Sequence, residues 1–231
     1  MHTRVVFFDW GGTLARTWMS EGHHPAEYWE LVLRERELRV RQASIRRALD
    51  DTDSELDGRI YEYLGRTREF WRLYDFQVMD RLGIDEGRDA LAETVERRIQ
   101  EASWGELYPE VMPTLTALRV RGFVRGVISN HNDALRDILA HHGLSNFFDT
   151  VTYSQEAGAE KPDRRVFDLA LQRANCQPGE ALHVGDSYRA DYIGATGVGM
   201  RAIWLNRLQV PPPEPCANVG DLRAILPLVS K

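Results

Sequence analysis

The chain has 231 residues, of which 43% are hydrophobic and 28% are charged, as is typical of globular proteins. Its formal net charge of -6 at pH 7 argues against a general binder of nucleic-acid backbones, and its two cysteines lack the spacing of zinc ligands or of a disulfide framework. No stretch approaches the roughly 20 apolar residues of a membrane-spanning helix, and the N-terminus lacks the apolar region of a signal peptide. We therefore expect a cytoplasmic protein whose partners include neither nucleic acid nor a membrane.

The first predicted strand, residues 4–9, is a short and almost continuous apolar run that stops at two glycines. Such a run is typical of a strand that is buried on both faces of a parallel sheet. From about residue 16 to residue 105 no strand pattern stands out, and helical stretches rich in arginine and glutamate take over. Leu91, Val95 and Ile99, for example, recur at helical spacing. We expect a small helical bundle that is inserted after the first strand.

Strand and helix patterns alternate along the rest of the chain. Four further strands are predicted, at residues 123–129, 147–154, 181–186 and 200–206. This alternation predicts an α/β fold with a doubly wound parallel sheet, formed by residues 1–15 and 106–231. Ligands of such sheets bind beyond the carboxyl ends of the strands, and Asp9, Ser129 and Asp186 all fall at such ends.

The residues that could carry chemistry gather at or near these predicted strand ends. They are Asp9, Thr13, Ser129, Asn130, Lys161, Asp186 and Asp191. Phosphoryl transfer through a carboxylate nucleophile requires such a set: oxygens that hold a hard Mg²⁺ ion, a cation for the phosphate, and small donors for its oxygens. Lys161 is the only lysine besides Lys231 in a chain rich in arginine, which favours a selected role for its compact ammonium group.

In this order the motifs resemble those of the haloacid dehalogenase superfamily, in its members with a helical C1-type cap inserted after the first motif. Four segments carry the resemblance: FFDWGGTL, GVISN, GAEKPDRRVF and VGDSYRAD. The resemblance covers nearly the whole chain. It implies a Rossmann-like catalytic core at residues 1–15 and 106–231 and a cap domain at residues 16–105.

The resemblance also implies a role for each site residue. Asp9 would be the nucleophile. The phosphoryl group would be bound by Thr13, Ser129, Asn130 and Lys161, and all of these except Asn130 would count as catalytic. Mg²⁺ would be held by Asp9, Asp186, Asp191 and the backbone carbonyl of Gly11, although Asp191 could instead hydrogen-bond Lys161. Most relatives are phosphatases of small phosphorylated metabolites, so we expect such a substrate and a monomer or homodimer.

The sequence departs from the phosphatases of this family at Gly11. There a second aspartate protonates the leaving group and then activates water, whereas Gly11 has no side chain. General acid/base groups contribute about 10²–10⁴-fold to rates, so we expect poor turnover when the leaving group needs a proton. His23, His24 and His131 are the obvious substitutes because imidazole titrates near neutral pH. We expect the first two to lie at a loop and helix start, and His183 to be packed within its apolar strand.

Two other functions stay open beside the Mg²⁺-dependent phosphatase. The dehalogenases of the family also lack the second aspartate, but they need no Mg²⁺ and usually do not keep the acidic fourth motif that Asp186 and Asp191 supply here. A catalytically weak relative that binds a phosphorylated ligand or a protein partner is supported by Gly11 and opposed by the otherwise complete set. Phosphonate hydrolases form a Schiff base with a cap lysine, and residues 16–105 contain no lysine.

Overall fold

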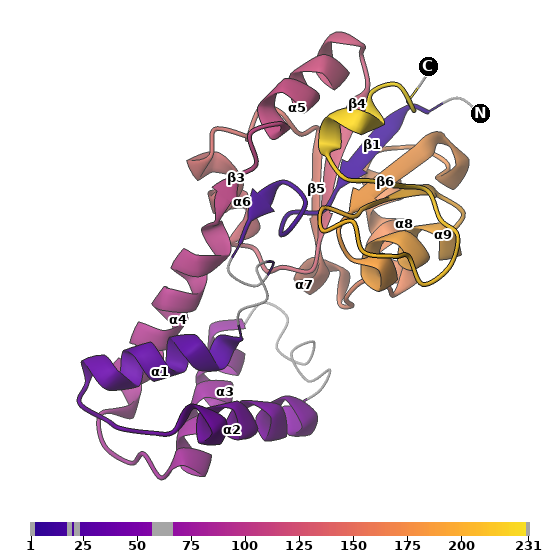
Figure 1. Cartoon of the computed structure of the whole chain (residues 1–231). Coiled ribbons are helices and arrows are strands. Elements are labelled where there is room, and N and C mark those ends of the chain that lie inside the picture. The colour runs from indigo at the N-terminus through magenta and orange to yellow at the C-terminus, as the bar shows by residue number, and fades with distance from the viewer. Residues whose placement is uncertain (1–2, 18–19, 21–23, 57–66, 230–231) are drawn as a thin grey trace. The chain divides into compact units, whose positions relative to one another are not determined.

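The computed structural model of the chain describes residues 3–17, 20, 24–56 and 67–229 (Figure 1). The chain divides into two compact units, one formed by Met1–Arg16 with Glu106–Lys231 and the other by Thr17–Gly105. Each unit has its own cluster of buried apolar residues. None of the helices in the described ranges combines the length and the hydropathy that crossing a membrane demands. The roles of the units as catalytic core and cap, and the cytoplasmic location, stay predictions.

A parallel six-stranded sheet forms the centre of the first unit, in the order β5-β4-β1-β6-β7-β8. Its strands are β1 (Val5–Phe8), β4 (Val124–Ser129), β5 (Thr150–Tyr153), β6 (Ala181–Gly185), β7 (Arg201–Leu205) and β8 (Asn218–Val219). The predicted doubly wound α/β fold is therefore confirmed. The chain builds β4 and β5 on one side of β1 and then crosses to the other side to build β6, so the strand order reverses at β1. Such a reversal is where ligands bind in open α/β sheets.

Helices cover the sheet of the first unit. They are α5 (Val111–Val120), α6 (Leu135–His141), α7 (Ser154–Ala157), α8 (Arg164–Arg173) and α9 (Gly194–Gly197), with the π-helix η4 (Tyr188–Ile193) and the 3-10 helices η3 (Pro178–Glu180) and η5 (Leu222–Ile225). Phe167 of α8 and Ala195 of α9 share one buried cluster with Val5 and Phe7 of β1. Because side chains alternate along a strand, the other two residues of β1 face the opposite side of the sheet. The central strand is thus buried on both faces, as its apolar sequence predicts.

Three strands of two residues were not predicted, because such short segments carry no periodicity. One is β8 at the sheet edge. The other two, β2 (Ala15–Arg16) and β3 (Glu106–Leu107), pair antiparallel in a small second sheet. They lie where the chain leaves the first unit and where it returns to it, so both connections of the inserted unit are held side by side.

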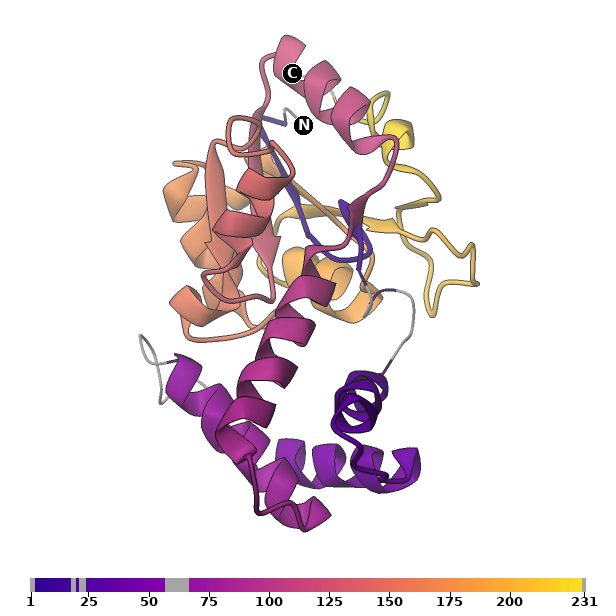
Figure 2. The same ribbon diagram turned by 90° about the vertical axis from the view of Figure 1, so that its left-hand side faces the viewer.

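In the described part of the second unit there are four α-helices (Figure 2): α1 (Pro25–Glu35), α2 (Gln42–Leu56), α3 (Thr67–Leu82) and α4 (Arg88–Trp104). Trp29, Ile45 and Val78 are among the residues of its buried core. Of the spaced apolar residues of α4, Leu91 and Val95 are buried in this core, whereas Ile99 one turn later is 41% exposed. The inserted segment is therefore a helical bundle, as the sequence predicts, although its apolar stripe ends earlier than the spacing indicates.

One buried carboxyl group should make the stability of the bundle depend on pH. Asp75 of α3 is only 5% exposed, and burial together with the charge of Glu96 raises its pKa from 3.8 to about 8. Between these two pH values the folded chain keeps a proton on Asp75 that the unfolded chain releases. The contribution of Asp75 to stability is therefore greatest below about pH 4 and decreases as the pH rises to about 8. One such proton changes the free energy of unfolding by about 1.4 kcal/mol per pH unit.

Asp75→Asn should flatten this pH dependence, because the amide stays neutral. Urea unfolding between pH 5 and pH 8 measures the effect, and the exposed Asp85 provides the control, since Asp85→Asn should keep the wild-type slope. Equal slopes in the wild-type protein and in Asp75→Asn would contradict the prediction.

Candidate active site

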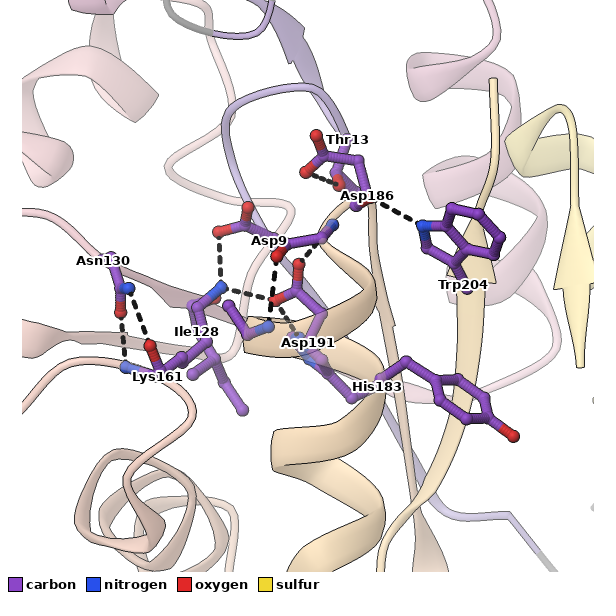
Figure 3. Close-up of polar contacts among 12 residues, drawn as sticks. Asp9, Thr13, Ile128, Asn130, Lys161, His183, Asp186, Asp191 and Trp204 are labelled. Atoms are coloured by element: carbon purple, nitrogen blue, oxygen red, sulfur yellow. Dashed lines mark hydrogen bonds and ion pairs between the residues drawn. The ribbon is translucent and has the colours of Figure 1, made fainter. Parts of the chain in front are cut away.

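Three neighbouring strands bring predicted site residues together at their carboxyl ends (Figure 3). Asp9 follows the last residue of β1, Ser129 is the last residue of β4, and Asp186 follows the last residue of β6. The sheet itself fixes Asp9, because its backbone N–H donates to the carbonyl of Val184 at 3.0 Å. Ser129 and the nearby Thr13 are both buried, so two hydroxyl groups also lie in this part of the core.

Lys161 places a buried positive charge between two carboxylates. Its Nζ lies 2.8 Å from Asp9 Oδ1 and 2.6 Å from Asp191 Oδ1, and it also donates to the carbonyl of Ile128 at 2.9 Å. Burial alone would lower the pKa of Lys161, but the charges of Asp191 and Asp9 outweigh it and raise the pKa above 10.5. The ammonium group thus donates hydrogen bonds to Asp191 and to the Ile128 carbonyl, whereas its contact with Asp9 Oδ1 is an ion pair without hydrogen-bond geometry.

The side chain of Asn130 holds the backbone of Lys161 in place. Lys161 N–H donates to Asn130 Oδ1 at 2.7 Å, and Asn130 Nδ2 donates to the Lys161 carbonyl at 3.2 Å. Both ends of the amide are therefore occupied by the protein. This arrangement leaves Asn130 better suited to positioning Lys161 than to the substrate contact that the sequence predicts.

Three donors surround the carboxylate of Asp191, which is almost completely buried. Its Oδ1 faces both Lys161 and His183 Nε2, the latter at 2.8 Å, and its Oδ2 accepts from the backbone N–H of Ser187 at 3.0 Å. Burial would raise the pKa of Asp191, but the Lys161 ammonium and His183 lower it well below its ordinary value. A Cβ on Gly185 would come within 2.1 Å of Asp191 Cγ, so only glycine leaves room for this carboxylate.

The contact between His183 and Asp191 was not predicted from the sequence. It is fully buried in β6, as predicted for a packed residue, but its ring also contacts the carboxylate of Asp191. The available signal was an imidazole in an otherwise apolar strand, eight residues before an aspartate. The sequence patterns around His183 and Asp191 do not show that the two side chains meet.

Asp186 is held from two sides. A Cβ on Gly12, whose φ is +69°, would come within 2.2 Å of Asp186 Oδ2, so the loop after β1 packs directly on this carboxylate. The indole Nε1 of Trp204 donates to the Asp186 backbone carbonyl at 2.7 Å, and Thr13 Oγ1 lies 3.5 Å from Oδ1. Burial and the charges of Asp9 and Asp191 raise the pKa of Asp186, against the opposing effect of Lys161.

The three carboxylates can share one cation. Asp9, Asp186 and Asp191 each offer an oxygen, and these atoms lie within 4.8 Å of one another. Within the described ranges, no basic side chain forms an ion pair with Asp186, so the single charge of Lys161 leaves the cluster negative. Hard carboxylate oxygens with excess negative charge fit Mg²⁺. Gly11, the fourth predicted ligand, is half-buried and forms an isolated bridge with Ala15, the first residue of β2.

The candidate proton donors lie in different settings. His24 caps α1 in the second unit, where its Nδ1 accepts from the N–H of Ala26 at 3.1 Å, so it has the structural role expected of a helix start. His131 follows Asn130 in the first unit, and burial lowers its pKa. Its Nδ1 lies 2.9 Å from the N–H of Asn132, which donates to it. His23 lies outside the described residues.

A family model described as haloacid dehalogenase-like hydrolase matches residues 3–199. Haloacid dehalogenase-like hydrolase domain-containing protein 3 of Bos taurus is 34% identical over 151 residues, which cover 64% of this chain and 58% of that protein. Phosphoserine phosphatase of Thermus thermophilus is 38% identical over 138 residues, which cover 56% of this chain and 55% of that protein. These matches span little more than half of either relative's length.

The solved structure of 2-haloacid dehalogenase from Pseudomonas syringae pv. Tomato DC3000 is similar over 99% of this chain and 97% of that one, with a TM-score of 0.75 and 26% sequence identity. A phosphatase is thus similar to this chain in sequence, and a dehalogenase is similar to it in structure. The chemistry of the site itself has to separate the two activities.

Removing the buried cation should destabilise the first unit. Lys161→Met leaves Asp9 and Asp191 buried without their partner, which should lower the free energy of unfolding by about 3–5 kcal/mol. The double variant Lys161→Met with Asp191→Asn should recover part of this loss, because one unpaired charge is then gone. Urea unfolding in the presence of a chelator measures both.

The exposed ion pair between Arg165 and Asp163 offers the control. Arg165→Met should change stability by no more than about 1 kcal/mol, as exposed pairs generally do. A comparable small effect of Lys161→Met would show that the buried lysine does not hold the site together.

Proposed function

Because the chain belongs to the family of haloacid dehalogenase-like hydrolases, we propose that it is a Mg²⁺-dependent phosphatase that acts on a small phosphorylated metabolite. The observation that carries this proposal is the cluster of three carboxylates around the single buried Lys161. Without a further cation such a cluster repels any anionic substrate, and a divalent ion would cancel its net negative charge. A phosphate monoester carries more negative charge than the single carboxylate of a 2-haloacid, so it would gain more from such an ion.

In this proposal Asp9 is the nucleophile. One of its carboxylate oxygens attacks phosphorus, the bond from phosphorus to the leaving oxygen breaks, and an aspartyl phosphate forms that water then hydrolyses. Lys161 stays protonated and neutralises charge on the phosphoryl group, and the hydroxyls of Thr13 and Ser129 donate to its oxygens. Asn130 and Asp191 support Lys161 from behind.

Mg²⁺ would be held by Asp9, Asp186 and the backbone carbonyl of Gly11, with Asp191 close by, and it would supply a positive charge opposite the phosphate oxygens. Asp186 is the residue whose environment most favours this arrangement. Its carboxylate is half-buried, faces two other carboxylates and has a raised pKa, so a nearby divalent cation would stabilise its charged form.

A 2-haloacid dehalogenase is the second candidate, and Gly11 is the observation that favours it. Attack of Asp9 on carbon would expel a halide ion, which needs no proton, so no acid at position 11 would be required. The same carboxylate would act in both reactions. The phosphatase is preferred here because Asp186 adds a half-buried carboxylate that a metal-free reaction does not use.

Removal of the metal or of either key carboxylate tests the phosphatase. Excess chelator and Asp9→Asn should each reduce phosphate release to background. Asp186→Asn should raise the Mg²⁺ concentration for half-maximal rate by about 10–100-fold or more, which is the range for the loss of groups that support a metal site. Phosphate release from a panel of esters, with Mg²⁺ titrated, measures all three.

Asp168→Asn is the matched control, since Asp168 pairs with Arg164 on the exposed face of α8. It should leave rate and Mg²⁺ dependence unchanged. Halide release from a 2-haloacid in the presence of chelator would overturn the phosphatase in favour of the dehalogenase. Binding of phosphate without any turnover would identify a catalytically weak relative.

Gly11 should make turnover depend on the leaving group. Aryl and acyl phosphates release weakly basic groups, so the wild-type protein should cleave them far better than alkyl phosphates. Gly11→Asp should raise alkyl phosphate turnover by a factor within about 10²–10⁴, the range of general acid/base catalysis. Gly11 is not among the glycines with positive φ, so the backbone accepts an aspartate there.

Gly11→Asn has nearly the same size but no ionisable group, so it should not reproduce the gain. The measurement is kcat/KM for an aryl and an alkyl ester in all three proteins. Equal cleavage of both esters by the wild-type protein would mean that another group supplies the proton, and His131 would then be the first residue to mutate.

A further inference from the structure

Arg207, two residues after β7, donates hydrogen bonds to the loop that follows Asp9. Its Nε donates to the carbonyl of Gly12 at 2.8 Å and its Nη2 to the carbonyl of Thr13 at 2.7 Å. Nearly two hundred residues separate these groups along the chain. Two adjacent carbonyls that accept from two N–H groups along one edge of a guanidinium form a two-pronged contact, which holds both position and orientation.

The guanidinium is itself held from its other sides. Its Nη1 donates to Glu110 Oε1 at 2.6 Å, and the side chains of Arg207 and Glu110 are only 18% and 6% exposed. Its central carbon lies 3.5 Å from the centre of the Tyr108 ring, a close cation-π contact. Tyr108 is in turn tied to the same loop, because its N–H donates to the carbonyl of Leu14 at 3.1 Å.

The two carbonyls that Arg207 binds belong to the residues that contact Asp186. Gly12 leaves the space that the Asp186 carboxylate occupies, and Thr13 brings its hydroxyl toward the same carboxylate. A shift of this backbone would therefore displace Asp186, Thr13 or both. Arg207 binds both residues through their backbone carbonyls, so its influence passes through the backbone.

We propose that Arg207 is a positioning residue, which fixes the loop of residues 10–14 and thereby the relative placement of Asp9, Thr13 and Asp186. Its kinetic consequence rests on the proposed phosphatase function. Glu110 and Tyr108 orient the guanidinium, and β7 anchors it to the sheet. Lysine cannot replace it, because one ammonium group cannot span two carbonyls and a carboxylate while stacking on a ring.

The test compares Arg207→Lys with the wild-type protein by amide hydrogen exchange and by kinetics. The N–H groups of Leu14 and Ala15 both donate to the Trp10 carbonyl within this loop. Exchange in a peptide that covers residues 10–16 should accelerate by at least about tenfold, since local opening becomes easier. With Mg²⁺ and an aryl phosphate, kcat should fall by about 10–100-fold with little change in KM, as expected for misplaced catalytic groups.

Arg125→Lys is the matched control. Arg125 is a buried arginine of β4 that pairs with Asp149 at 2.8 Å, and it lies at the opposite end of its strand from Ser129. It should leave kcat and the exchange of residues 10–16 unchanged. Should Arg207→Lys fail to fold, Glu110→Gln serves instead, because it weakens the ion pair at nearly constant size and should accelerate exchange in the same loop to a smaller extent.

Unchanged exchange of residues 10–16 would overturn the proposal, whatever the activity. Equal losses of kcat in Arg207→Lys and Arg125→Lys would also overturn it, since both would then act through general stability. Faster exchange in Arg207→Lys alone supports it, even if the wild-type protein hydrolyses no phosphate ester. In that last case the proposed function fails while the positioning role stands.

Discussion

The buried ammonium group of Lys161 is the constraint on which the rest of the site depends. A charge in the core is tolerated only if anions and dipoles compensate it, and Asp9, Asp191 and the carbonyl of Ile128 do so within 3 Å. The carboxylates that compensate this charge need hydrogen-bond donors of their own. Asp191 needs the donors of His183 and Ser187, as well as the space that a glycine leaves in β6. The site is therefore an electrostatic network that is built into the sheet.

The order of the strands makes this network possible. β1 has β4 on one side and β6 on the other. The carboxyl ends of these three strands therefore lie together at the point where the strand order reverses. Main-chain atoms then approach side chains more closely than a Cβ would allow, at Gly12 beside Asp186 and at Gly185 beside Asp191. Close packing in turn brings the carboxylates near enough to one another to require a cation.

The apolar runs and their polar endings were sufficient to predict the parallel sheet and the place where Asp9, Ser129 and Asp186 converge. The isolated lysine of an arginine-rich chain also pointed to Lys161. Sequence patterns could not predict which side chains meet across the fold, because such contacts join residues far apart along the chain. The bond between His183 and Asp191 and the engagement of Asn130 with the Lys161 backbone belong to this class. The strands β2, β3 and β8 were missed for a different reason, since two residues show no period.

The antiparallel pairing of Arg16 with Glu106 has a consequence for how such chains diversify. The segment between these two residues is topologically the loop of a hairpin, and the pairing of β2 with β3 holds its two ends together. The entropy of closing a loop rises only slowly with its length, by about 0.6 kcal/mol for each doubling, so the sheet is nearly indifferent to how much chain the hairpin carries. A helical bundle, a shorter loop or an unrelated fold could occupy the same place without altering the register of β1. The first unit can thus retain its network of carboxylates around Lys161 while the inserted sequence changes.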